Sequence, residues 1–323
     1  MSVKWGVLGT ANIAQGCTIP GMKDASNCEL YAIAGRNEAK VNDYKERFGF
    51  EKGYVGYDSL LEDPDVQAVY VPLPNSLHKE WVIKALKAGK HVLCEKPMAL
   101  NADDAREMFA VAKENNVILM EAYAYLHGQY IESLKADIKS GVIGDIDLIE
   151  TAFYTQGYEE DIRLYKELGG GAVYDLGCYC TTMILSLIDS DVDYVKADAE
   201  FNDKGADVFA SCLMKFKNGA RAAFDVGMIF DPSNNGRYDR LYIHGSKGIL
   251  ISDVEYNQSG KVSYTIKSGT AEYHPSINVY NNYMLEIEQL GRCIEKGEQP
   301  HITEDFTVKN AEVLDMVLKQ IGY

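Results

Sequence analysis

The stretch that decides the fold is Gly6-Val7-Leu8-Gly9-Thr10-Ala11-Asn12-Ile13-Ala14. It joins an apolar run at 3–8, typical of a strand, to a segment with helical spacing. In a dinucleotide-binding fingerprint, a glycine such as Gly9 makes the tight turn and the helix N-terminus faces a pyrophosphate. Alanines stand at the second and third glycine positions of that fingerprint. The place of the stretch at the start of a β-α-β array still favours a cofactor site over an ordinary strand-to-helix turn.

The first 120 residues alternate apolar runs with helix-period segments, which predicts a parallel sheet covered by helices. Further strands are expected at 30–34, 68–71, 91–94 and 117–120. Asn37 and Asn101 are expected to cap two of the helices, and Gly89 to end a third. The pattern ends near residue 122, so 1–122 is predicted to be a doubly wound Rossmann domain.

The second part of the chain has long alternating runs, which are typical of antiparallel strands. These runs lie at 146–153, 208–216, 220–226 and 261–266. Helices are expected at 131–138, 171–188, 283–294 and 303–321. Residues 123–323 are therefore predicted to form a second, α+β domain, with the last helix packing back on the first domain.

Composition limits the partners and the location. Forty-eight acidic against 32 basic residues give a net charge of −16. Such a surface repels nucleic-acid phosphates and anionic membranes, so neither is an expected partner. No apolar run approaches the ~20 residues of a membrane span, and no signal-peptide pattern is present, so a cytoplasmic location is expected. Seven scattered cysteines and six histidines show no ligand spacing, so no metal site is predicted.

The end of the second predicted strand bears on the choice of cofactor. NAD-binding domains usually carry Asp or Glu there, for the ribose 2′-hydroxyl, whereas this chain has Gly35-Arg36-Asn37. The guanidinium of Arg36 suits a 2′-phosphate, which favours NADP and leaves NAD open. The alternative is that Arg36 is a solvated surface side chain.

Two motifs suggest acid/base chemistry. Cys94-Glu95-Lys96-Pro97 follows a predicted strand, at the sheet edge where ligands bind in open α/β folds. Gly169-Gly170-Gly171 leads into a helix on which Asp175 and Tyr179 are four residues apart. A nearby ammonium such as that of Lys96 favours a phenolate and could make Tyr179 a proton carrier. The alternatives are a solvated lysine and a packing tyrosine.

In these motifs the chain resembles the Gfo/Idh/MocA family of oxidoreductases over nearly its whole length. The similarity lies in the Gly9 turn and in residues 73–78, 95–97, 120–122 and 161–179. The resemblance implies a Rossmann domain, then an open, mostly antiparallel sheet whose exposed face mediates formation of a dimer or a dimer of dimers. It also implies NAD(P) as cofactor.

The resemblance and the local patterns together assign roles to individual residues. Lys96, in a Lys96-Pro97 peptide expected to be cis, would orient the reacting hydroxyl and support Tyr179 as general acid/base. Asp175 would hold a neighbouring substrate hydroxyl, and Tyr123 and Arg163 would also border the substrate. The expected cofactor contacts are Gly9, Thr10, Ala11, Asn12, Ile13, Arg36, Leu73, Pro74, Asn75, His78, Glu95 and Lys96.

Tyrosine at position 179 is similar to the family branch of glucose-fructose oxidoreductase, NADP-dependent xylose dehydrogenase and dihydrodiol dehydrogenase. The expected function is therefore NADP-dependent hydride transfer to or from a secondary alcohol or carbonyl of a sugar-like or cyclic diol substrate. A non-catalytic protein that senses NADP and a sugar, and an NAD-recycling glycosidase, are the alternatives. Arg163, Arg237 and Arg240 keep a phosphorylated substrate open.

One segment departs from the family pattern. Relatives often read E-A-F-M-Y-R-F-H-P, whereas this chain has Glu121-Ala122-Tyr123-Ala124-Tyr125-Leu126-His127-Gly128. The arginine and the proline are missing, which leaves the identity of the sugar or diol open. His127 is expected to cap the following helix, with a polar substrate contact as the alternative.

Overall fold

The computed structural model describes residues 2–158, 160–230, 238–253 and 256–323. The chain forms two compact units. Unit 1 consists of residues 1–127 and 281–308, and unit 2 of residues 128–280 and 309–323. Within the described chain, none of the helices combines the length and apolarity that a membrane crossing requires.

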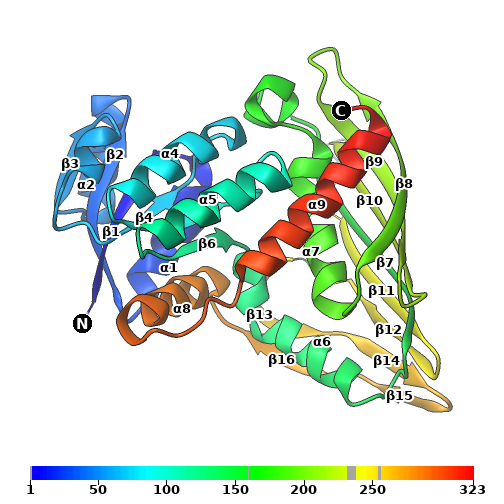
Figure 1. Ribbon diagram of the computed structural model, residues 1–323. Helices are drawn as coiled ribbons and strands as arrows, with labels where there is room; N and C mark the ends of the chain where they lie inside the picture. The colour runs from blue at the N-terminus through cyan, green and yellow to red at the C-terminus, as the bar shows by residue number, and fades with distance from the viewer. Residues whose placement is uncertain (1, 159, 231–237, 254–255) are drawn as a thin grey trace. The chain divides into compact units, whose positions relative to one another are not determined.

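Unit 1 is built on a six-stranded parallel sheet in the order β3-β2-β1-β4-β5-β6 (Figure 1). This is the doubly wound Rossmann order, and β1 and β4 lie side by side where the winding reverses. The strands are β1 Val3–Leu8, β2 Cys28–Gly35, β3 Lys52–Val55, β4 Ala68–Val71, β5 His91–Glu95 and β6 Leu119–Ala122. Strand β3 was not predicted from the sequence, because its four residues alternate in burial and include a glycine.

The helices of unit 1 begin and end where local chemistry predicts. The side chain of Asn37 accepts a hydrogen bond from the Lys40 N–H, and Asn101 caps its helix in the same way through Asp104. Gly89 has a φ of 74°, as expected after a helix. The helices are η1 Ala14–Thr18, α1 Ile19–Asp24, α2 Glu38–Phe48, α3 Asp58–Leu61, α4 Asn75–Lys87, α5 Ala102–Glu114, η2 Ala124–His127 and α8 Asn282–Lys296.

Helix α8 belongs to unit 1, although it lies far along the chain and was expected in the second domain. It packs on α1 and also contacts β1 and β2. Gly21 of α1 allows the close approach, since a Cβ there would lie 2.7 Å from Cβ of Tyr283. This pairing depends on residues about 260 positions apart, which no local pattern reports.

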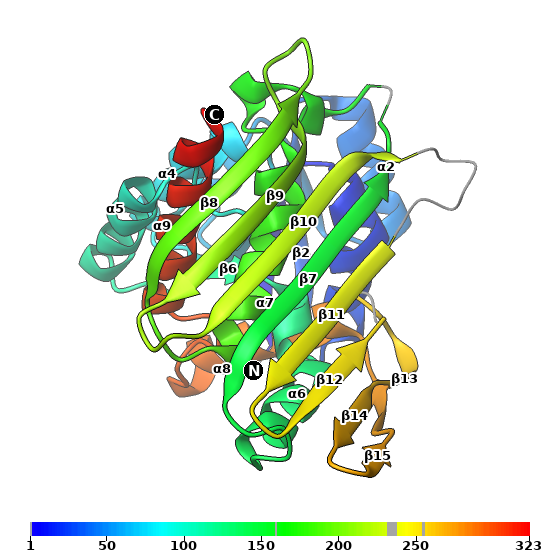
Figure 2. The same cartoon turned by 90° about the vertical axis from the view of Figure 1, so that its right-hand side faces the viewer.

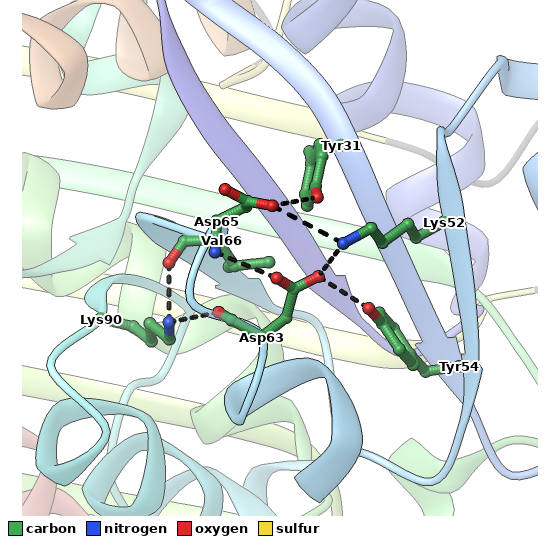
Figure 3. Close-up of polar contacts among 7 residues, drawn as sticks. All are labelled: Tyr31, Lys52, Tyr54, Asp63, Asp65, Val66 and Lys90. Atoms are coloured by element: carbon green, nitrogen blue, oxygen red, sulfur yellow. Dashed lines mark hydrogen bonds and ion pairs between the residues drawn. The ribbon is translucent and has the colours of Figure 1, made fainter.

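Polar side chains that are hydrogen-bonded to one another and to the backbone surround the loop that leads into β4 (Figure 3). Asp63 accepts hydrogen bonds from Lys52 Nζ at 2.9 Å and from Tyr54 Oη at 2.6 Å. Lys90 Nζ donates to the carbonyl oxygens of Asp63 at 2.7 Å and Val66 at 2.8 Å. Burial alone would raise the pKa of Asp63, but the hydrogen bonds from Tyr54 and Lys52 outweigh it and lower the pKa to about 2. The cluster fixes the loop at the amino ends of β4 and β5.

Unit 2 contains an eight-stranded sheet in the order β15-β14-β12-β11-β7-β10-β9-β8, which faces the viewer in Figure 2. Its described neighbours pair antiparallel except for β7 and β10, which are parallel, so the predicted mostly antiparallel sheet is confirmed. Its strands are β7 Ile146–Gln156, β8 Val192–Phe201, β9 Asp207–Phe216, β10 Arg221–Phe230, β11 Tyr238–Gly245, β12 Gly248–Ser252, β14 Thr265–Ser268 and β15 Ala271–Tyr273.

The strand predicted at 261–266 is two strands in two sheets. β13 (Gly260–Ser263) pairs with β16 (Ser276–Val279), whereas β14 joins the large sheet. The break falls at Tyr264, which is buried and bonded to Ser133 of helix α6 (Gln129–Lys139) at 2.7 Å. A buried tyrosine continues the alternating pattern, so the sequence did not indicate the break.

The last helix, α9 (Glu304–Ile321), is divided between the units. Its residues up to Val308 group with unit 1, and those from Lys309 onward group with unit 2. In unit 2, Asn310 accepts a hydrogen bond from Thr181 at 2.6 Å, and Tyr323 donates to the Gly170 carbonyl at 2.6 Å.

Candidate active site

The predicted cofactor residues of unit 1 gather at the carboxyl ends of four neighbouring strands. Gly9 follows β1, Arg36 follows β2, Leu73-Pro74-Asn75 follows β4, and Lys96 follows β5. Because the strands are parallel and adjacent, these ends form one edge of the sheet. Ligands of open α/β sheets bind at this edge, beside the point where the winding reverses.

The turn at Gly9 has the geometry of a phosphate-binding turn. Gly9 has a φ of 131°, and a Cβ there would lie 3.2 Å from Cδ2 of Leu73, so a side chain is excluded. The hydroxyl of Tyr44 lies within hydrogen-bond distance of the Thr10 and Ala11 carbonyls, at 3.2 and 3.3 Å. The helix that begins at Asn12 and continues through η1 leaves its first N–H groups for a ligand. These features fit a pyrophosphate.

Arg36 stands immediately after β2 and is exposed. Its guanidinium contacts the hydroxyl of Tyr57, where it opposes the rise in pKa that burial causes for that tyrosine. Gly35 and Asn37, on either side, carry no acid, and Asn37 is used as a helix cap. This end of β2 therefore fits a 2′-phosphate better than a bare ribose hydroxyl.

The turn that carries Lys96 is held by two buried titratable side chains. The Lys96-Pro97 peptide is cis, as expected. The ring of His78 lies 2.8 Å from the Leu73 carbonyl and 3.0 Å from the Pro97 carbonyl. Glu121 accepts a hydrogen bond from the Met98 N–H at 2.8 Å, and burial raises its pKa to about 7. The ring of His78 thus supports this turn. Burial is the main cause that lowers the pKa of its imidazole.

Two residues with predicted ligand contacts, Glu95 and Tyr123, have side chains that are engaged within the protein. Glu95 is hydrogen-bonded to Tyr70, which also accepts a hydrogen bond from Thr18 at 2.9 Å, so this carboxylate ties β5 to η1. Tyr123 is fully buried with its ring edge-on to Tyr125. Roles for Glu95 and Tyr123 toward cofactor and substrate remain predictions.

The expected capping role of His127 is wrong. Gly128 occupies the N-cap of α6. The ring of His127 is buried, stacks on His301 at 5.3 Å between centroids, and lies 3.9 Å from the Glu286 carboxylate. Contacts within unit 1 from the distant 281–308 segment therefore decide its position, and these are invisible in a local pattern.

In unit 2 the three glycines form a tight turn before the predicted helix. Gly171 has a φ of 115°, and a Cβ there would lie only 2.0 Å from Oδ1 of Asp207. The other Asp207 oxygen accepts the Val173 N–H at 2.8 Å and so caps the helix. Burial raises the pKa of Asp207 to about 6. Asp207 was not predicted from the sequence, because it lies 34 residues after Val173, whose N–H it accepts.

Arg163 and Asp175 are brought together. Arg163 Nε donates to Asp175 at 2.8 Å, and Nη1 donates to Asp161 at 3.0 Å, so Arg163 orders the loop before the glycines. The helix opens with a π turn, η5 (Val173–Gly177), before α7 (Cys178–Leu187). Asp175 therefore lies in a π turn and Tyr179 in the α-helix that follows it, and π turns recur at functional sites.

Tyr179, at the start of α7, is surrounded by residues that the sequence analysis did not select. Its ring centroid lies 5.5 Å from that of Phe153 and 5.4 Å from that of Tyr256. Asn257 Nδ2 donates to its hydroxyl oxygen at 3.2 Å. These partners come from β7 and from the segment after β12, more than 70 residues beyond Tyr179 in the latter case. No sequence signal connects them to Tyr179.

Comparison with protein families identifies both parts of the chain. Residues 3–123 match the model GFO_IDH_MocA, described as an oxidoreductase family with an NAD-binding Rossmann fold. Residues 131–251 match the GFO/IDH/MocA C-terminal domain. The chain belongs to the Gfo/Idh/MocA oxidoreductase family. The resemblance seen in the sequence, the two-part fold and the assignment as an oxidoreductase are thereby confirmed.

Three similar members of the Gfo/Idh/MocA family cover almost the whole chain. D-xylose 1-dehydrogenase (NADP(+)) 2 of Haloferax volcanii is 29% identical over 97% of this chain and 95% of its own. Trans-1,2-dihydrobenzene-1,2-diol dehydrogenase of Xenopus tropicalis is 28% identical over 100% and 99%. The 3-ketoreductase KijD10 of Actinomadura kijaniata, solved with NADP and TDP-benzene, is similar in structure with a TM-score of 0.93 and 29% identity. That match covers 99% of this chain and 98% of KijD10.

Metal ligation has no support in the geometry of the described ranges. Within 2–158, 160–230, 238–253 and 256–323, no three His, Cys, Asp or Glu side chains are arranged to hold an ion.

Proposed function

We propose that this protein is an NADP-dependent dehydrogenase or reductase that acts on a secondary alcohol or carbonyl of a sugar-like or cyclic diol substrate. The observation that carries the proposal is the edge of unit 1 where Gly9, Arg36 and Lys96 follow adjacent parallel strands. NADP is preferred over NAD because Arg36 occupies the position where an acid would bind a ribose hydroxyl. NADP in the names of the xylose dehydrogenase and of the KijD10 complex supports the same choice.

The residues of the chain divide the chemistry as follows. Bound NADP supplies or accepts the hydride. Tyr179 exchanges the proton with the substrate hydroxyl, and the ammonium of Lys96 favours its phenolate, which otherwise forms only near pH ~10. Asp175, oriented by Arg163, accepts a hydrogen bond from a neighbouring substrate hydroxyl. Two anchored hydrogen bonds at adjacent hydroxyls would select a diol unit over a lone alcohol.

The positions of the arginines favour a substrate that carries no nucleotide. Of the arginines that kept a phosphorylated substrate open, Arg163 is engaged by Asp161 and Asp175. Arg240 is in β11, where its neighbours in sequence Asp239 and Leu241 are buried, and lies 3.9 Å from Asp225. Arg237 lies outside the described residues. A nucleotide-linked sugar is the second candidate, because TDP-benzene is bound in KijD10.

We also infer a homodimer, formed through the outward face of the eight-stranded sheet, in the cytoplasm. Leu213 is 61% exposed and Tyr194 is 45% exposed, and both lie on the strands at one edge of that sheet. Exposed apolar side chains on a broad sheet favour association. Leu213→Glu should convert the dimer to monomers in sedimentation experiments, whereas an unchanged mass would remove the proposed interface. Cell fractionation tests the location.

The decisive test is NADP reduction by the purified protein across pentoses, hexoses, inositols, trans-dihydrodiols and dTDP-linked sugars. Tyr179→Phe is measured beside it, with Tyr273→Phe in β15 as a matched control at an exposed tyrosine. Turnover by the parent protein and the control, but not by Tyr179→Phe, supports the proposal. NADPH binding without any turnover would favour a sensor, and glycoside cleavage without net NADP reduction would favour a recycling glycosidase.

A further inference from the structure

The segment after β12 places two side chains beside Tyr179. Tyr256 is 4% exposed, and three separate elements fix it. Its N–H donates to Asp239 in β11 at 3.1 Å, and its hydroxyl lies 2.6 Å from Thr151 Oγ1 in β7. The same hydroxyl contacts Cys180 Sγ in α7 at 3.6 Å. These contacts fix the position of Tyr256 and so restrict the backbone position of the next residue, Asn257.

The ring of Tyr256 also joins an aromatic cluster. It stacks on Phe153 with 5.2 Å between centroids and 17° between planes, and it lies tilted by 47° against Tyr179. Phe153 meets Tyr179 edge-on at 62°. The rings of Phe153 and Tyr256 thus pack against the ring of Tyr179 and restrict its position.

Asn257 contributes a polar contact to this apolar cluster. Its Nδ2 donates to Tyr179 Oη at 3.2 Å. Its Oδ1 is buried, and within the described part of the chain it has no hydrogen-bond partner. A buried acceptor left unpaired destabilises a protein, so the position of this amide is not explained by stability alone. What the amide does provide is a donor at the phenol oxygen.

We propose that Asn257 is a positioning residue for Tyr179, whose amide N–H stabilises the phenolate and holds the oxygen in place for proton transfer. A donor to the charged form of an acid favours that form, and the contact is partly buried, where a hydrogen bond is stronger than in water. The inference rests on the proposed role of Tyr179 as proton carrier. It adds a second source of phenolate stabilisation, from within unit 2, to the ammonium of Lys96.

Among the described residues, three titratable groups lie next to Tyr179 or its aromatic neighbours, and substitution of Asn257 leaves them in place. Asp175, one turn earlier in the chain, is paired with Arg163 at 2.8 Å. Asp239 holds the Tyr256 N–H. Burial raises the pKa of Cys180, so it stays a neutral thiol. A change in the titration of Tyr179 in an Asn257 variant therefore reports on the amide.

The test is an NMR titration of tyrosine labelled with ¹³C at Cζ, in which the Tyr179 signal is assigned by its loss in Tyr179→Phe. Asn257→Ala removes the donor and should raise the pKa of Tyr179 by about one unit. Asn257→Asp keeps the shape, places a carboxylate beside the phenol, and should raise the pKa further. Asn278→Ala, an exposed asparagine of β16, is the matched control and should change nothing.

An unchanged pKa in both Asn257 variants would overturn the proposal, and a lowered pKa in Asn257→Ala would show that Tyr179 donates to the amide instead. If Asn257→Ala does not fold, Asn257→Leu takes its place, because it has a similar size and no donor and should also raise the pKa of Tyr179. A second readout is the acid limb of kcat for alcohol oxidation, which should move to higher pH with the KM for NADP unchanged. A shifted pKa with an unmoved acid limb would reject Tyr179 as the proton carrier and leave the contact with Asn257 established.

Discussion

The amino ends and the carboxyl ends of the parallel strands of unit 1 have opposite characters. Before the strands, the charges of Asp63, Lys52 and Lys90 are paired with one another or with backbone carbonyls (Figure 3). After the strands, the backbone is shaped by Gly9 and by the cis Lys96-Pro97 peptide, and the cationic side chains Arg36 and Lys96 lie at the edge where open α/β sheets usually bind ligands. We therefore expect substitutions at the amino ends of the strands to change stability and substitutions at the carboxyl ends to change activity.

The largest expected effect is that of Lys96→Met. Loss of the ammonium should lower kcat by about 10²–10⁴-fold, because a general acid/base at the wrong pKa loses most of its contribution. The free energy of unfolding should change by less than about 0.5 kcal/mol, as for other substitutions outside the core. Steady-state kinetics and urea unfolding on the same preparation measure both quantities. If Lys96→Met lost stability but kept its turnover, the carboxyl ends of the strands would serve stability and not catalysis.

Asp63→Asn should have the complementary effect, with kcat retained and the free energy of unfolding lowered by about 2–4 kcal/mol. The pKa of Asp63 is about 2 when folded, below its ordinary value of 3.8. Its stabilising contribution is therefore present above pH 4 and is lost as the pH falls toward 2. Urea unfolding between pH 2 and 7 should show a flatter acid decline in the variant. An equally steep decline would mean that other carboxylates cause it.

Arg36→Ser tests the carboxyl end for cofactor choice. Loss of a charge-assisted contact to the 2′-phosphate should raise the Kd for NADP by about 10–100-fold and leave that for NAD unchanged. Lys40→Ser, an exposed lysine in the first turn of α2, is the matched control for the loss of one positive charge nearby. Equal weakening of NADP and NAD by Arg36→Ser would show that the arginine supports the loop and not the phosphate.

The smallest effect is expected from Glu121→Gln, which keeps an acceptor for the Met98 N–H. Burial raises the pKa of Glu121 from 4.5 to about 7, so the folded state holds this proton more tightly than the unfolded state. The free energy of unfolding should therefore fall as the pH rises from 4.5 to 7, and the variant should lack that component. Thermal unfolding over this range compares the two slopes. Parallel slopes would mean that Glu121 is ionised throughout.

Much of unit 1 could be predicted from sequence, because its signals are local. The apolar runs, the Asn37 and Asn101 caps and the Gly9 turn each depend on residues within a few positions. The same chemistry could not place α8, whose packing on α1 is a contact between distant segments. It also could not show β3, whose short alternating pattern lacks an apolar run.

The candidate site was predictable where a motif carries it and not where the fold assembles it. The glycine-rich turn before η5 was visible in the sequence, but Asp207 was not. Asp207 caps the helix and occupies the space that a side chain at position 171 would require. Tyr179 was visible, whereas Tyr256 and Asn257 reach it only through the long return of the chain after β12. In each case the missing partner comes from another strand or loop of the same unit.

We propose that Lys96 and Tyr179 act as one acid/base unit, and a double-mutant cycle measures how strongly the two residues are coupled. The kcat values of Lys96→Met, Tyr179→Phe and the double variant are compared with that of the parent protein at saturating NADP and substrate. Residues that act as a unit are strongly non-additive, so the double variant should be about as slow as the slower single variant. If the fold-loss of kcat in the double variant equals the product of the two single losses, Lys96 and Tyr179 work independently and do not form one acid/base unit.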